Sequence, residues 1–114
     1  MTIEQAKIKA EILKALAHPV RLILVDALSK GDMCVCDLNC LVSIDQSSVS
    51  RHLAQLKKAG IVSERRDGMR VIHHLETPCI LNAVGCAENV LTSRRSLEKK
   101  IIKGKSNGSG KQQR

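Results

Sequence analysis

The 114-residue chain contains no phenylalanine, tyrosine or tryptophan. Its core must therefore be built from aliphatic side chains, and a chain of this length has room for one modest core. Proteins that hold single-stranded DNA or read RNA sequence usually stack the bases on aromatic rings. The lack of such rings argues against single-stranded nucleic acid as a partner, whereas duplex DNA can be read by polar side chains in its grooves.

The sequence also lacks a signal-peptide pattern at its start and any apolar run of membrane-spanning length. We therefore expect a cytoplasmic protein with no membrane partner, in which thiols stay reduced. The five cysteines are an odd number, which fits poorly with a closed disulfide framework. Metal or redox chemistry is the expected use of these thiols.

The net charge of +8 is unevenly distributed. Residues 94–114 hold eight Lys/Arg against one Glu, whereas residues 1–93 hold eleven Lys/Arg against ten Asp/Glu. DNA binding by the folded part must therefore depend on where individual side chains lie. We expect one domain over residues 1–93 and a basic, disordered tail over residues 94–114.

Apolar spacing predicts two helices in the first thirty residues. A stripe at Ile8, Ile12 and Leu16 predicts the first helix. Pro19 suits the first position of a second helix, and Gly31 suits its end. On its inner side the second helix is expected to carry Val20, Ile23, Leu24, Ala27 and Leu28.

The middle of the chain predicts a helix-turn-helix. An extended piece at residues 32–34 leads into a short helix over residues 36–42. Asp45 is a suitable N-cap for the next helix, which carries Val49 and Leu53 inward and ends at Gly60. Two short helices joined by a tight turn are typical of helix-turn-helix proteins.

A hairpin is predicted directly after this motif. Residues 61–66 and 70–75 read as strands that flank the turn Asp67-Gly68-Met69. The predicted fold is thus mainly helical with a small β-hairpin, a winged helix-turn-helix.

The last predicted helix starts near Pro78 and is apolar nearly all round over residues 80–91. Such a helix must be covered on both sides, which predicts a homodimer through the terminal helices. Cys79 and Cys86 are seven residues apart and share one face of this helix. They are either small packing residues at the dimer seam or a second thiol site.

A thiol cluster, Cys34, Cys36 and Cys40, lies just before the predicted DNA-reading helix. Three thiolates suit soft, thiophilic ions. Cys34 and Cys36 cannot face each other on a regular helix, so the helix start must stay extended if both bind one ion. The alternatives are buried packing cysteines and a structural zinc site, which normally takes four ligands.

Short polar side chains and an arginine start the helix after Asp45, as expected of a helix that enters a DNA groove. The expected duplex contacts are Gln46, Ser47, Ser48, Ser50, Arg51 and His52 on the helix, and Arg65, Arg66 and Arg70 on the hairpin. The hairpin arginines are placed for phosphates or the minor groove. The alternative is that the serines cap the helix and the arginines are only solvated. Thiols beside a DNA-reading helix indicate a ligand-controlled transcription factor.

With these elements placed, the chain resembles the ArsR/SmtB family of winged-helix metal sensors over about residues 8–92. The matching segments are His18-Pro19-Val20-Arg21, Cys34-Val35-Cys36-Asp37-Leu38, Ser50-Arg51-His52-Leu53 and Arg66-Asp67-Gly68. The Cys-Val-Cys-Asp-Leu segment is similar to the arsenite and antimonite branch of the family.

This resemblance implies a dimeric repressor that leaves its operator in double-stranded DNA when As(III) or Sb(III) is bound by Cys34, Cys36 and a third cysteine. The family's third thiol usually follows Asp-Leu directly, where this chain has Asn39. Cys40 lies one position later and is an i, i+4 neighbour of Cys36. The family's oxygen- and nitrogen-ligand zinc site in the last helix has no counterpart in this sequence.

Two alternatives remain on the same fold: a Cd(II), Pb(II) or Zn(II) sensor, and a repressor that responds to thiol oxidation or persulfides. We expect no enzyme, because the sequence has no Gly-rich phosphate loop after a strand, no His-Glu-x-x-His motif and no nucleophile–base pattern.

Overall fold

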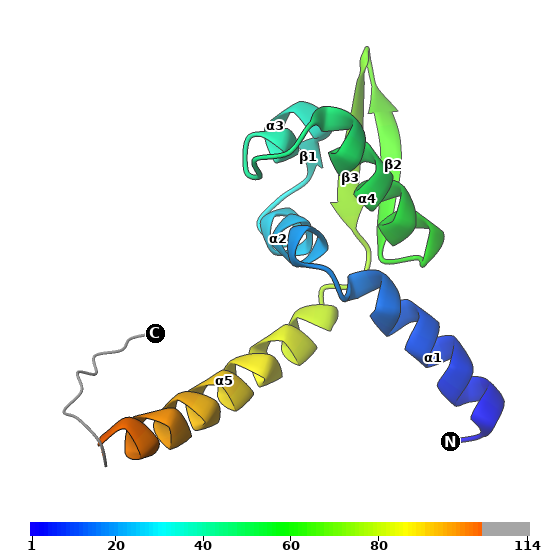
Figure 1. Cartoon of the computed structure of the whole chain (residues 1–114). Coiled ribbons are helices and arrows are strands. Elements are labelled where there is room, and N and C mark those ends of the chain that lie inside the picture. Colours follow the sequence, from blue (N-terminus) through cyan, green and yellow to red (C-terminus); the bar gives the residue numbers. More distant parts are fainter. Residues whose placement is uncertain (104–114) are drawn as a thin grey trace. The chain divides into compact units, whose positions relative to one another are not determined.

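The structure is a computed structural model that describes the backbone of residues 1–103 and the side chains of residues 1–95. The chain divides into two compact units, Met1–Pro78 and a second unit that begins at Cys79. The first unit contains α1 (Ile3–Leu16), α2 (Pro19–Leu28), β1 (Met33–Cys34), α3 (Val35–Asn39), α4 (Gln46–Lys58), β2 (Val62–Asp67) and β3 (Arg70–Leu75), and the second contains α5 (Ile80–Lys103) (Figure 1). The predicted winged helix-turn-helix, mainly helical with a small sheet, is confirmed.

The first two helices begin at side-chain caps. Thr2 and Gln5 form a reciprocal capping box at the start of α1. His18 caps α2 by accepting a hydrogen bond of 3.1 Å from the backbone N–H of Val20, and Pro19 occupies the first turn as predicted.

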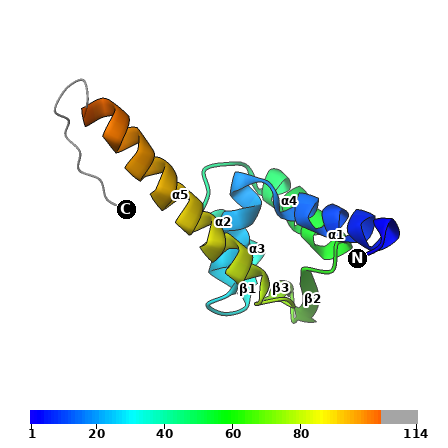
Figure 2. The same ribbon diagram turned by 90° about the horizontal axis from the view of Figure 1, so that it is seen from below.

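The buried sides of these helices differ from the predicted stripes. In α2 the buried residues are Leu24, Val25 and Leu28, whereas Ile23 is 45% exposed. The helix is turned so that Val25 meets the core, because α4 and β3 both pack against α2. Of α1 only Leu16 is buried, and Ile8 is 63% exposed, although α1 contacts both α2 and α4 (Figure 2). The sequence pattern located both helices and correctly placed Leu16, Leu24 and Leu28 in the core, but it wrongly placed Ile8 and Ile23 there and did not include Val25.

The sheet has three antiparallel strands in the order β1-β3-β2. β1, predicted only as an extended piece, pairs with β3 so that Cys34 lies opposite Ile72. β2 and β3 form the predicted hairpin, and their pairing extends to Asp67 opposite Arg70. The connecting turn therefore has two residues, Gly68 and Met69. Gly68 has a φ of 68°, which a residue with a Cβ rarely adopts.

The core of the first unit is aliphatic, as the composition requires. Its largest fully buried side chains are Leu24, Val25, Leu38, Val49, Leu56 and Ile61. Leu38 of α3 is among them, and α3 contacts α4, β1 and β3. The short helix α3, which begins directly after Cys34, is therefore held between α4 and the sheet.

α5 continues ten residues past the domain boundary predicted at residue 93. The remainder of the predicted disordered tail, residues 104–114, lies outside the described residues. None of the described side chains of α5 is buried, and Cys79 and Cys86 are both exposed. Within residues 1–103, no helix is both long and apolar enough to cross a membrane.

Candidate nucleic-acid interface and thiol site

The start of α4 is held by Asp45. One carboxylate oxygen of Asp45 accepts a 3.0 Å hydrogen bond from the backbone N–H of Ser48, and the other accepts a 2.8 Å bond from the Ser48 hydroxyl. The Ser47 hydroxyl also donates to Asp45. These donors hold the pKa of Asp45 far below its usual value. Ser47 and Ser48 therefore serve the cap, which was the alternative interpretation of the serines.

The outer side of the first turns of α4 is open. Gln46, Ser50 and Arg51 are exposed, and the Arg51 guanidinium donates a 2.9 Å hydrogen bond to the Ser48 hydroxyl. A link from Asp45 through Ser48 to Arg51 thus orients the arginine that we expected to read DNA. The helix presents a short polar surface suited to hydrogen bonds with base edges and phosphates.

His52, which we predicted as a DNA contact, has partners inside the protein. Its Nδ1 accepts a 3.1 Å hydrogen bond from Nε of Arg21. Its ring centroid is 4.3 Å from that of His18. Burial is the main cause that lowers the pKa of His52, and the positive charges of His18 and Arg21 lower it further. The residue joins α4 to the start of α2.

Two of the three hairpin arginines also point to partners within the chain. Arg65 donates a 2.8 Å hydrogen bond to Asp32. Arg70 donates to Sγ of Cys34 at 3.0 Å and lies 3.5 Å from the Asp37 carboxylate. Arg66 is exposed and has no hydrogen-bond or ion-pair partner among the described residues. Of the predicted wing contacts, Arg66 is therefore the side chain left free for DNA.

Cys34 is the buried member of the thiol cluster, with 3% of the residue exposed. It is the N-cap of α3 and has extended backbone angles, φ −88° and ψ 168°. This is the extended helix start that a shared ion would require. The hydrogen bond from Arg70 lowers the pKa of Cys34, because the guanidinium stabilises the thiolate.

The three thiols are only partly brought together. The neighbouring Cys34 thiol raises the pKa of Cys36. Cys40, at the end of α3, instead donates a 3.4 Å hydrogen bond to the backbone oxygen of Cys36. Among the residues that the structure describes, no three His, Cys, Asp or Glu side chains are arranged to hold a metal ion. The arrangement provides two neighbouring sulfurs and a third one helical turn away.

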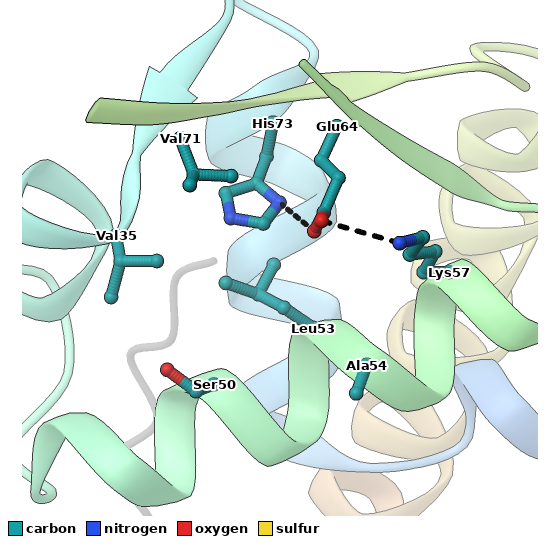
Figure 3. A pocket seen from close by; sticks show the side chains of 8 residues that line it. All are labelled: Val35, Ser50, Leu53, Ala54, Lys57, Glu64, Val71 and His73. Atoms are coloured by element: carbon teal, nitrogen blue, oxygen red, sulfur yellow. Dashed lines mark ion pairs between the residues drawn. The ribbon is translucent and has the colours of Figure 1, made fainter. Parts of the chain in front are cut away.

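A pocket that no sequence pattern predicted lies between α4 and the sheet (Figure 3). The side chain of His73 points into this pocket, and only 5% of the residue is exposed. Nδ1 of His73 lies 4.0 Å from Glu64, and Glu64 lies 3.2 Å from Lys57 of α4. Burial lowers the pKa of His73, because it disfavours the charged ring.

The sequence reasoning also missed two acidic residues beside the thiols, Asp32 and Asp37. Asp32 accepts hydrogen bonds from both Arg65 and His74, which lower its pKa. The register of the three strands brings Asp32 close to Arg65 and His74, and this register cannot be derived from the sequence alone.

Comparisons with known proteins agree with this geometry. Residues 18–64 match the family model described as bacterial regulatory protein, arsR family. The chain is 34% identical over 87 residues to the nodulation protein NolR of Rhizobium meliloti, covering 76% of this chain and 71% of that protein. It is 37% identical over 76 residues to the arsenic resistance transcriptional regulator ArsR1 of Pseudomonas putida, covering 64% and 59%.

A solved structure shares the fold as well. The crystal structure of the transcriptional repressor BigR from Xylella fastidiosa superposes with a TM-score of 0.62 at 35% identity, covering 74% of this chain and 93% of that one. The names of these relatives refer to different functions, so the matches show the family but do not identify the effector to which this chain responds. On these matches, and on the winged helix with its cysteine-bearing α3, the chain belongs to the arsR family of bacterial regulatory proteins.

Proposed function

We propose that this arsR-family transcriptional repressor binds an operator in duplex DNA as a homodimer and releases it when As(III) or Sb(III) is bound by the thiols at α3, controlling arsenic-resistance genes. The observation that carries the proposal is the extended backbone of Cys34 at the start of α3, a short helix that carries Cys36 and packs against α4. Such a regulator acts by binding and not by catalysis.

The chemistry of the sulfurs supports a soft effector. Thiolates prefer thiophilic ions and are poor ligands for Mg²⁺ or Ca²⁺. Each As–S bond replaces an As–OH bond of arsenous acid, and the displaced hydroxyl leaves as water with the thiol proton. For Cys40 to complete the set, its contact with the Cys36 carbonyl must break and α3, a helix of five residues, must rearrange. Because α3 contacts α4, that rearrangement would disturb the DNA-reading helix.

DNA binding is assigned to the exposed start of α4 and to the wing. Gln46, Ser50 and Arg51 would face bases or phosphates, and Arg66 would reach the backbone beside them. All four of these side chains lie in the first unit, so the assignment of the DNA contacts does not depend on the basic tail.

The homodimer is proposed to cover apolar side chains that are exposed in the single chain. These are Ile3, Ile8 and Leu13 of α1, Leu22 and Ile23 of α2, and Val90 and Leu91 of α5. Isolated apolar side chains are common on surfaces, but several apolar side chains exposed along one helix suit a self-complementary two-fold interface. Sedimentation equilibrium should give twice the 12.5 kDa chain mass.

A second candidate effector is an oxidant or a persulfide. Two neighbouring thiols, one of them with a lowered pKa, can be oxidised to a disulfide or capped by persulfide sulfur. The same sulfurs could also take Cd(II), Pb(II) or Zn(II). Cys79 and Cys86 on α5 are the less favoured second thiol site.

One experiment separates these effectors. A fluorescently labelled duplex, selected by the protein from a random library, is titrated with As(III), Sb(III), Cd(II), Pb(II), Zn(II), peroxide and persulfide. We expect As(III) and Sb(III) to weaken DNA binding by about 5- to 150-fold. The Cys36→Ser variant should lose this response, and the Cys79→Ser control should keep it. Equal release of wild type and Cys36→Ser by As(III) would exclude the proposed site.

A further inference from the structure

The outer half of the wing is attached to the rest of its unit by few contacts. Pairing between β1 and β3 ends with Cys34 opposite Ile72. Beyond that point, residues 66–71 pair only with each other across the hairpin. The side chain of Arg70 crosses this gap. Arg70 lies two residues from Ile72 on β3, so both side chains project from the same face of the sheet as Cys34.

At the end of this side chain the contacts form a closed triangle. The Arg70 guanidinium donates to Sγ of Cys34 at 3.0 Å and lies 3.5 Å from the Asp37 carboxylate. The Cys34 thiol in turn donates to Asp37 at 3.3 Å. The wing, the last residue of β1 and the first turn of α3 therefore meet at one buried sulfur.

A second bridge joins the same two parts of the unit. Asp32, just before β1, accepts a 2.8 Å hydrogen bond from Arg65 of β2 and lies 2.7 Å from His74 of β3. The segment 32–37, which carries the first two thiols, is thus fastened to the hairpin on both sides of Cys34. Exposed ion pairs of this kind contribute little individually. The Arg70 contact differs because its sulfur partner is buried.

We infer that Arg70 transmits the state of the thiol site to the wing: it holds the wing in its DNA-binding position while Cys34 is free, and lets it go when Cys34 binds the effector. The inference rests on the proposed function for the identity of the effector. An arsenic or antimony atom bonded to Cys34 replaces the thiol hydrogen that is now donated to Asp37, and it places a large atom on the sulfur beside the Arg70 guanidinium, so this set of contacts opens. Loss of the contact frees the outer wing, and with it Arg66. Arg70 is on this view a positioning residue and not a DNA contact.

The first test uses the full chain without any effector. Affinities for the selected duplex are measured for wild type, Arg70→Ala, Cys34→Ala and the double variant. If the two residues act as one unit, each single variant should weaken binding by about fivefold, and the double variant should be no weaker than either. Effects that simply multiply in the double variant would overturn the inference. The pair Arg70→Ala and Asp37→Asn gives the same cycle if Cys34→Ala disturbs folding.

The second test distinguishes a positioning role from a phosphate contact, with Arg66→Ala as the matched control. Removing a phosphate contact should flatten the slope of log affinity against log salt by about one unit. We expect that loss for Arg66→Ala and an unchanged slope for Arg70→Ala. Hydrogen exchange should also be faster at residues 66–71 in Arg70→Ala than in wild type. A flattened slope without faster exchange would make Arg70 a DNA contact.

The two proposals fail separately. If wild type keeps its DNA when As(III) is added, the proposed function is wrong, and the effector-free cycle still decides whether Arg70 and Cys34 are coupled. If wild type releases DNA and Arg70→Ala shows the same fold-change on As(III) addition, the role of Arg70 is overturned while the proposed function stands. We expect the As(III) fold-change to fall at least about threefold in Arg70→Ala.

Discussion

Nε of Arg21 donates a hydrogen bond of 3.1 Å to Nδ1 of His52, joining the first turn of α2 to the middle of α4. The same guanidinium donates a 2.9 Å bond to the backbone oxygen of Ala15 near the end of α1. One partly buried arginine therefore fixes three helices, and the orientation of the DNA-reading helix depends on it.

Replacing this arginine should destabilise the first unit. Arg21→Ala leaves the Ala15 carbonyl and the His52 ring without their donor, so we expect the free energy of unfolding to fall by about 1–3 kcal/mol. Urea denaturation followed by far-UV circular dichroism measures the change. Lys30→Ala, which removes an exposed ion pair with Asp26, is the control and should be nearly neutral. Equal effects of the two variants would refute the role given to Arg21.

The cap at Asp45 should matter for both folding and DNA binding. Asp45→Ala removes the acceptor for Ser47 and Ser48 and loosens the first turn of α4, where Arg51 is oriented. We expect a lower melting temperature and weaker duplex binding. Asp45→Asn keeps a capping oxygen and should retain most of both properties. A full loss in Asp45→Asn would mean that the charge, and not the cap, is essential.

Stability should fall on mild acidification because of His73. Burial lowers the pKa of His73 below its ordinary 6.5 in the folded state, so the unfolded chain binds a proton at a higher pH. The contribution is complete above the unfolded pKa and is lost as pH falls toward the folded pKa. Asp32 acts at lower pH, since its pKa is lowered from 3.8. Denaturation between pH 7.5 and 5 should therefore show a shallower pH dependence in His73→Leu than in wild type. An identical slope would contradict this account.

Thiol labelling tests the burial of Cys34. Its lowered pKa favours reaction, whereas its 3% exposure opposes it. Because a reagent must first reach the sulfur, we expect access to decide. Brief treatment of the effector-free protein with iodoacetamide, followed by peptide mapping, should modify Cys40 well before Cys34. Faster labelling of Cys34 would show that the segment opens readily in solution. The order should be lost in Arg70→Ala if the wing contact keeps this segment closed.

Local signals were sufficient to predict most of the fold. Pro19, the Asp45 cap and the turn at Gly68 each act within a few residues, so the sequence located the helix starts and the hairpin. The apolar stripe of α2 was less informative, because Ile23 is exposed and Val25 is buried. Which side of a helix is covered depends on its neighbours, and spacing along one helix does not specify them.

The candidate site could be predicted by residue type but not by contact. Cys34 and Cys36 were expected to need an extended helix start, and Cys34 has that backbone. Arg65, Arg70 and His52 were expected on DNA, yet each has a side-chain partner 31 to 36 positions away in the chain. Strand register and helix packing set such pairs, and neither can be read from a single sequence.

The turn between β2 and β3 places Met69 at the tip of the wing with 95% of the residue exposed. Since the chain has no tryptophan, tyrosine or phenylalanine, it has no intrinsic fluorescence and absorbs very little light at 280 nm. A Met69→Trp substitution would introduce a lone fluorophore at the tip, and its emission would follow wing docking and release in real time without an external dye.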